Sequence, residues 1–171
     1  MILYTADKQP IFVSKSNLDH LQAHDNVLPF LEEATALIHL PKNDSFYRKS
    51  ICLGRVIGSN NCVSTDIISP YTPSTFATRT GRQLPTRITI NHRPSPCDSV
   101  SVIAVCNNKK WQLITAYIGP LAPREPHDSY FLDHPEELAE ALRFWCCHAL
   151  IYEANWSNIF VSTWQDIINS N

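Results

Sequence analysis

The sequence predicts an α+β domain in which N-terminal helices and a C-terminal helix pack on one face of a four- to five-stranded, mainly antiparallel sheet. Two patterns lead to this prediction. Apolar residues alternate with other residues in the segments 86–92, 99–106 and 111–118, as in strands that bury one face. Apolar residues also recur at helical spacing on both sides of these segments. Because its 171 residues are 44% hydrophobic, the chain can bury a core, and we expect a single domain over residues 1–171.

The N-terminal part is expected to contain two short strands followed by helix. The β-prone runs 2–5 and 11–13 flank a turn. A helix is predicted to begin near Ser16, where Asp19 three residues later resembles a capping box. A second apolar stripe runs through LPFLEEATALIHL, and Pro41 ends it.

The rest of the chain alternates between irregular and regular segments. Residues 51–57 predict a strand, whereas 58–84, rich in Ser, Thr, Asn and Pro, predict a long irregular insertion. A tight turn at 107–110 joins two of the predicted strands into a β-hairpin. Residues 133–152 follow the spacing of an amphipathic helix, and 158–162 predict a last strand.

Alternation along the three central strands assigns each side chain to a face. The residues predicted to face the core are Ile88, Ile90, Val100, Val102, Ala104, Cys106, Ile114, Ala116 and Ile118. The residues predicted on the opposite face are Arg87, Thr89, Asn91, Arg93, Trp111, Thr115 and Tyr117. Guanidinium, hydroxyl and aromatic groups on one face suit the binding of phosphates and stacked bases.

Composition excludes several classes of protein. Four glycines argue against a nucleotide fold built on a glycine-rich loop. No apolar run is long enough for a membrane span, and the N-terminus lacks the features of a secretory signal, so a cytoplasmic location without membrane partners is expected. The six cysteines are then expected to be free thiols, and their spacing does not favour a metal site. We expect no cofactor.

Charge is divided unevenly along the chain. Residues 42–124 contain eleven Lys and Arg against three Asp, a net charge of +8, while the remaining segments carry −10. One interpretation is that the middle of the chain faces a polyanion. The other is that the acidic ends fold back and pair with the middle.

A family resemblance rests on three stretches. These are QPIFVSKSNLDHLQAH, the acidic amphipathic segment after it, and the hairpin ending in KKWQLITAYIG. Together they resemble the small ribonuclease toxins with barnase-like, EndoU-like, colicin-type and RelE-type domains, as found in phage and polymorphic toxins. The resemblance implies helices before a curved antiparallel sheet and RNA cleavage without a metal. The insertion at 58–84 departs from this group and matches no catalytic pattern.

The resemblance assigns functional positions to His20, His24, Thr115 and Tyr117. Such cleavage needs a base, an acid and donors for the phosphate charge, and two histidines four residues apart share one helical face. With Arg93 as a further phosphate donor, the predicted catalytic residues are His20, His24, Arg93, Thr115 and Tyr117. The predicted substrate-binding residues are Arg87, Lys109, Lys110 and Trp111.

Each assignment has a simpler alternative. The histidine pair also fits a solvated helix face or part of a metal site. Thr115 and Tyr117 also fit the polar side of a half-buried sheet, and the arginines also fit pairing with an acidic helix. The sequence therefore predicts a metal-independent endoribonuclease of toxin type, or alternatively a non-enzymatic module that binds nucleic acid or protein. The partners implied are RNA and an acidic antitoxin or immunity protein.

Overall fold

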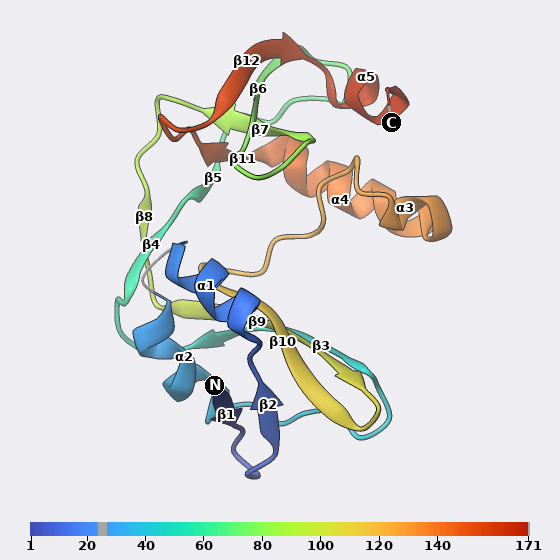
Figure 1. Cartoon of the computed structure of the whole chain (residues 1–171). Helices are drawn as coiled ribbons and strands as arrows, with labels where there is room; N and C mark the ends of the chain where they lie inside the picture. The colour runs from blue at the N-terminus through green and yellow to red at the C-terminus, as the bar shows by residue number, and fades with distance from the viewer. Residues whose placement is uncertain (24–26, 171) are drawn as a thin grey trace. The chain divides into compact units, whose positions relative to one another are not determined.

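The computed structural model describes residues 1–23 and 27–170, and the chain forms two compact units (Figure 1). The first unit comprises Met1–Asn60 and Ser95–Leu121, and the second comprises Asn61–Pro94 and Ala122–Asn171. Each unit has its own hydrophobic cluster, whereas the sequence predicts one domain around one core. The α+β composition is as predicted, but the strands form two five-stranded sheets and one two-stranded sheet.

The first unit is built on a mainly antiparallel sheet. Its strands, in spatial order, are β1 (Ile2–Tyr4), β2 (Pro10–Phe12), β10 (Lys110–Ile118), β9 (Ser99–Asn107) and β3 (Phe46–Cys52). The predicted hairpin is confirmed, because β9 and β10 pair antiparallel from Asn107–Lys110 to Val100–Ile118. β2 pairs parallel with β10, and the small sheet of β4 (Gly58–Asn60) and β8 (Ser95–Cys97) completes the unit.

Two helices cover one face of this sheet. They are α1 (Lys15–Ala23) and α2 (Leu28–Thr35), which has a proline in its first turn where no backbone donor is lost. Both send leucines into the core, where Leu21 and Leu31 are buried with Leu3 and Ile11 from β1 and β2. The long strands contribute Tyr47, Val100, Val102, Ala104, Trp111, Leu113, Ala116 and Ile118.

A β-bulge in β10 corrects the predicted sidedness of this strand. The register shifts between Leu113 and Thr115, so Ile114 is an extra residue and alternation changes phase there. Ala116 is therefore buried as predicted, but Ile114 is 47% exposed and Trp111 lies in the core instead of on the opposite face.

The second unit is built on a sheet of short strands. In spatial order they are β12 (Ser157–Ser162), β6 (Ser74–Thr78), β7 (Pro85–Thr89), β11 (His148–Ile151) and β5 (Cys62–Ser64). The segment 58–84 is thus not one irregular insertion, since β4, β5 and β6 fall within it. The strand predicted at 86–92 forms β7 in this sheet and does not join the hairpin; Ile88 is buried, but Ile90 is 72% exposed.

Three helices belong to the second unit. They are α3 (Tyr130–Asp133), α4 (Pro135–Cys147) and α5 (Trp164–Asn169). The helix predicted over 133–152 ends at Cys147, and its last residues form β11 instead. Trp145 from α4 and Trp164 from α5 are buried against Phe76 of β6. Within residues 1–23 and 27–170, no helix is long and apolar enough to cross a membrane.

Candidate nucleic-acid interface

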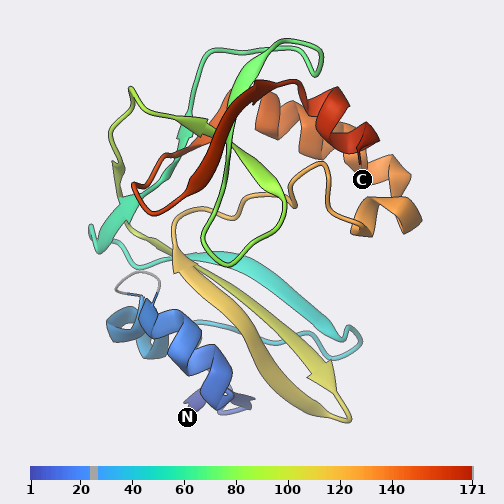
Figure 2. The same cartoon turned by 45° about the horizontal axis from the view of Figure 1, so that its top comes forward.

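The helix that carries His20 lies beside the strand that carries Thr115 and Tyr117 (Figures 1 and 2). Asn17 of α1 donates a side-chain hydrogen bond to the backbone carbonyl of Leu113, directly before the bulge. Leu21 of the same helix is buried in the core with Leu113. The two elements that the sequence predicts to share a site are therefore neighbours, but α1 packs on the core face of the sheet, whereas Thr115 and Tyr117 lie on the opposite face. The second predicted histidine, His24, lies outside the described residues.

Thr115 and Tyr117 are half-buried on the sheet face that points away from α1 and α2, which we call the outer face. Alternation and register place the following residues on it: Ile2, Tyr4, Phe12, Phe46, Arg48, Ser50, Ser101, Ile103, Val105, Lys110, Gln112, Thr115 and Tyr117. The bulge at Ile114 is what keeps Thr115 and Tyr117 on this face while Leu113 stays in the core.

One end of the outer face is closed by the chain that follows β10. The hydroxyls of Ser50 and Ser101 lie 2.8 Å apart, and Ser101 also donates to the carbonyl of Gly119 at 2.7 Å. The backbone N–H of Leu121 donates to the Ser50 hydroxyl at 2.7 Å. This network is in register with Tyr117, so it fixes the strand end at which the predicted hydroxyl donors lie.

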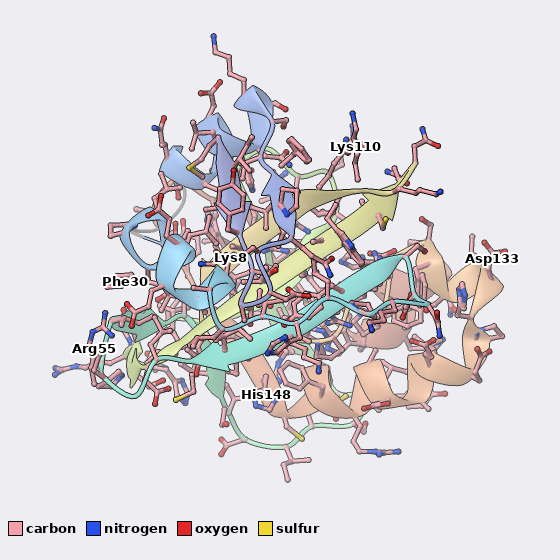
Figure 3. All side chains as sticks on the ribbon, turned by 90° about the horizontal axis from the view of Figure 1, so that it is seen from below. Lys8, Phe30, Arg55, Lys110, Asp133 and His148 are labelled. Atoms are coloured by element: carbon pink, nitrogen blue, oxygen red, sulfur yellow. The ribbon has the colours of Figure 1, made fainter. Side chains whose placement is uncertain are left out.

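The other end of the outer face leads to the hairpin turn. Asn108 and Lys109 adopt left-handed conformations with φ of 50° and 62°, as a tight two-residue hairpin turn requires. Lys109 and Lys110 are both exposed, as expected for the predicted substrate-binding residues. Lys110 and Arg55 lie at opposite ends of this unit in Figure 3.

The five strands of this sheet, all within the described residues, contain no Asp or Glu. Their charged residues are Arg48, Lys49 and Lys110. The acids of the first unit lie in its helices and loops instead. The charged side chains of these strands are therefore all basic, and two of them, Arg48 and Lys110, lie on the outer face, which favours an anionic ligand.

The two folded units differ much less in net charge than the middle and the ends of the linear sequence do. The first unit holds eight Lys and Arg against seven Asp and Glu, a net of +1, and the second holds six against nine, a net of −3. Arg55 pairs with Glu33 at 2.5 Å, and Arg79 pairs with Glu125, so basic residues of the middle do bind acids of the ends. Among the described residues, the pairing interpretation thus holds for three of the eleven basic residues of the +8 segment, Arg55, Arg79 and Arg124, the last of which pairs with Asp128.

Two predicted substrate-binding residues have other positions. Trp111 is only 7% exposed and belongs to the core, because the bulge changes the phase of β10. Arg87 is 6% exposed in the second unit, where its guanidinium donates to Ser74 and to backbone carbonyls at the end of α4. Arg93 is exposed, but it also belongs to the second unit and not to the sheet of Thr115 and Tyr117.

Sequence reasoning missed a buried polar cluster in the second unit. The carboxylate of Glu125 forms an ion pair with Arg79, and its Oε2 lies 3.5 Å from Nε2 of His127. Thr86 lies beside the same carboxylate. Burial raises the pKa of Glu125, but His127 and Arg79 outweigh it and lower the pKa overall. Burial likewise lowers the pKa of His127, but Glu125 outweighs it and raises the pKa. The nearby Cys62 is half-buried, and desolvation of its thiol, with a smaller effect of the Glu125 charge, raises its pKa to about 12.

This cluster is closed rather than accessible. His127 is 7% exposed and its Nε2 lies 2.6 Å from the carbonyl of Pro85. Glu125 is 9% exposed. Because a catalytic group must reach its substrate, we assign the cluster to stability. The only sequence signal for it was the charged stretch PREPHD in a proline-rich segment.

Among the described residues, no three His, Cys, Asp or Glu side chains converge on a metal position. Comparison with known proteins gave no match: no family model, no curated protein and no solved structure is similar to this chain. The resemblance to ribonuclease toxins therefore stays a prediction from the sequence.

Proposed function

We propose that the first unit acts on RNA as a metal-independent endoribonuclease, with its substrate at the edge of β10 next to α1, where His20 approaches from the helix and Thr115 and Tyr117 approach from the outer face. The observation that carries the proposal is the juxtaposition of α1 and β10. Asn17 ties the helix of His20 to the strand whose bulge presents Thr115 and Tyr117.

His20 takes the role of a general acid or base in this proposal. An imidazole has one nitrogen that can donate a proton and one that can accept a proton, which suits it to either role. Removing such a group costs on the order of 10²- to 10⁴-fold in rate. Thr115 and Tyr117 supply hydroxyl donors for the charge that develops on the phosphate.

The basic sheet supports binding of the substrate. Arg48 lies in the same cross-strand row as Thr115, because both pair with Ile103. A guanidinium beside two hydroxyls suits a phosphodiester, since it donates two parallel hydrogen bonds. Arg48 thus takes the place that the sequence analysis gave to Arg87 and Arg93.

The test is incubation of the purified protein with total RNA in EDTA, followed by analysis of the product ends. Wild type is expected to release fragments with 2′,3′-cyclic phosphate ends. His20→Ala should lose most of this activity, and Tyr117→Phe should lower it by removing one donor. His39→Ala is the matched control, because His39 is an exposed histidine of the same unit outside the site. Equal activity in His20→Ala and His39→Ala would refute the role of His20.

A second candidate is a module that binds RNA without cutting it. The basic, acid-free sheet favours this function independently of any histidine. Absence of cleavage together with salt-sensitive RNA binding would select it. In either case a basic sheet is a natural target for an acidic protein partner, which is the form we propose for an antitoxin or immunity protein.

A further inference from the structure

We infer that the hairpin-turn half of the outer face is a stacking site for unpaired nucleotides. The inference rests on the proposed action on RNA, but it concerns different residues from those placed at the scissile phosphate. The site is formed by Tyr4 of β1, Phe12 of β2 and Phe46 of β3, with Lys110 and Gln112 of β10 among them.

Strand register places these side chains on one surface. Phe12 pairs with Gln112, Gln112 pairs with Val105, and Val105 pairs with Phe46, so the four residues form a row across the sheet. Neighbouring strands lie about 4.8 Å apart, which puts Phe12 and Phe46 about 14 Å from each other. The row of Thr115 and Arg48 is the next one along the strands, about 7 Å away.

Two of the three rings are exposed where a folded protein would ordinarily bury them, and Phe12 is half-buried. Tyr4 is 55% exposed, Phe46 is 41% exposed, and Ile2 in the same row as Phe12 is 45% exposed. An uncovered group of large apolar side chains on one face marks a binding surface. The core of this unit lies on the opposite face, so these rings are not needed to hold α1 or α2.

Charge selects nucleic acid as the occupant. Exposed Lys110 lies on β10, which is between the strand of Phe12 and the strand of Phe46. The adjoining turn adds exposed Lys109. No acid occurs in any of the five described strands, so nothing in them opposes a phosphate backbone. Flat rings next to a cation are the combination that binds single strands, by stacking on bases and by attraction to phosphates.

The geometry favours unpaired over paired RNA. A base inside a duplex is stacked on its neighbours and offers no free face to a protein ring, and its flanking groove does not admit side chains. An unpaired base can lie on Phe46 or Tyr4 while Gln112 reaches its edge with an amide that both donates and accepts.

The test is a binding titration with a fluorescent single-stranded oligonucleotide carrying 2′-O-methyl riboses, which the proposed mechanism cannot cleave, and with the same strand in a duplex. We expect wild type to bind the single strand more tightly. Phe46→Ala and Tyr4→Ala should each weaken single-strand binding by on the order of 5- to 150-fold, the loss of one stacked base.

Three controls make the result specific. Leu37→Ala removes an equally exposed apolar side chain (55% exposed) outside the sheet and should bind as wild type does. Phe46→Leu keeps the apolar side chain but removes the flat ring, so it should also lose affinity, whereas a protein partner would tolerate it. Phe46→Trp should retain binding, which separates loss of stacking from loss of fold.

The outcomes separate this inference from the proposed nuclease. Single-strand binding that depends on Phe46 supports the stacking site even if total RNA is never cut, which would refute the nuclease alone. RNA cleavage with unchanged binding by Phe46→Ala and Tyr4→Ala would overturn the stacking site alone. Equal affinity for single strand and duplex would also overturn it.

Discussion

Removing the carboxylate of Glu125 is expected to destabilise the second unit strongly. Glu125 is 9% exposed and is the partner of both Arg79 and His127. Glu125→Leu leaves the guanidinium of Arg79 largely buried without its counter-charge, which costs about 3–5 kcal/mol in other proteins. Because the Arg79 side chain is 24% exposed and can turn toward water, we expect about 3 kcal/mol.

A double variant distinguishes the loss of the ion pair from the loss of packing. In the double variant Arg79→Met/Glu125→Leu both charges are gone, and apolar side chains of similar size replace them. Replacing a whole buried pair in this way is often close to neutral, so the double variant should be more stable than Glu125→Leu alone.

Urea unfolding followed by tryptophan fluorescence measures this effect. Three of the four tryptophans, Trp145, Trp156 and Trp164, lie in the second unit, so the signal reports mainly on it. Arg124→Met is the matched control, because the pair of Arg124 with Asp128 lies in the same unit but is largely exposed, so its loss should leave the unfolding midpoint nearly unchanged. A cost below about 1 kcal/mol for Glu125→Leu, or a double variant that loses the sum of both singles, would show that the pair is not a buried charge network.

Three further predictions follow from single features. Glu125 raises the pKa of His127 above its ordinary 6.5. The contribution of protonated His127 to the free energy of unfolding is therefore complete below pH 6.5 and is lost as the pH rises through the raised pKa. The urea midpoint should fall over this window in wild type and stay level in His127→Gln. Deleting Ile114 removes the bulge but preserves the faces of Leu113 and Thr115, so this variant should fold with a native circular dichroism spectrum, whereas deleting Gln112 shifts Trp111 out of the core and should not. Thr163→Ala removes the side-chain oxygen that accepts from the backbone of Asp166 at 3.0 Å and should lower the stability of the second unit by about 1 kcal/mol; an unchanged midpoint would mean that α5 does not need its cap.

Local signals in the sequence predicted much of the first unit. The hairpin of β9 and β10 follows from two alternating segments around a tight turn, and both strands begin and end within a residue of the prediction. The helices α1 and α2 also begin where the sequence placed them, but α2 ends at Thr35 and does not continue to Pro41. These elements depend on contacts between residues that are near in sequence, which is why a pattern reveals them.

Long-range pairing was not predictable in the same way. β7 has the alternation of a hairpin neighbour, but it pairs parallel with β11 about sixty residues later in the chain, Leu150 next to Ile88. Nothing in a strand's own sequence names its partner. The three adjacent strand signals, which predicted a single sheet, therefore belong to two sheets. Arg93 belongs to a different unit from Thr115.

Alternation failed where one residue broke its phase. Because Ile114 is an extra residue in β10, Ile114 is exposed and Trp111 lies in the core, the reverse of the prediction. Ala116, Thr115 and Tyr117 lie on the faces predicted for them. A bulge has no composition of its own in this strand, since Ile114 is a good β-former. Thr115 and Tyr117 thus lie on the predicted face and their role as donors stays a prediction, whereas Trp111 lies in the core, and Phe46 on another strand takes its place in our proposal.

Arg87 shows why residue type alone could not place the candidate site. A strand arginine was assigned to phosphate oxygens, but its Nη1 donates to the carbonyls of Trp145, Cys146 and His148 at 3.1–3.2 Å. The last carbonyls of a helix carry partial negative charge and lack helical partners, so the end of α4 offers a guanidinium the same kind of acceptor that a phosphate does. Only the fold decides between the two, because the guanidinium of Arg87 reaches the end of α4 and the residue is 6% exposed there. Arg48 is half-buried on the outer face in the row of Thr115, and this difference in position, not in chemistry, makes it the arginine we place at the phosphate.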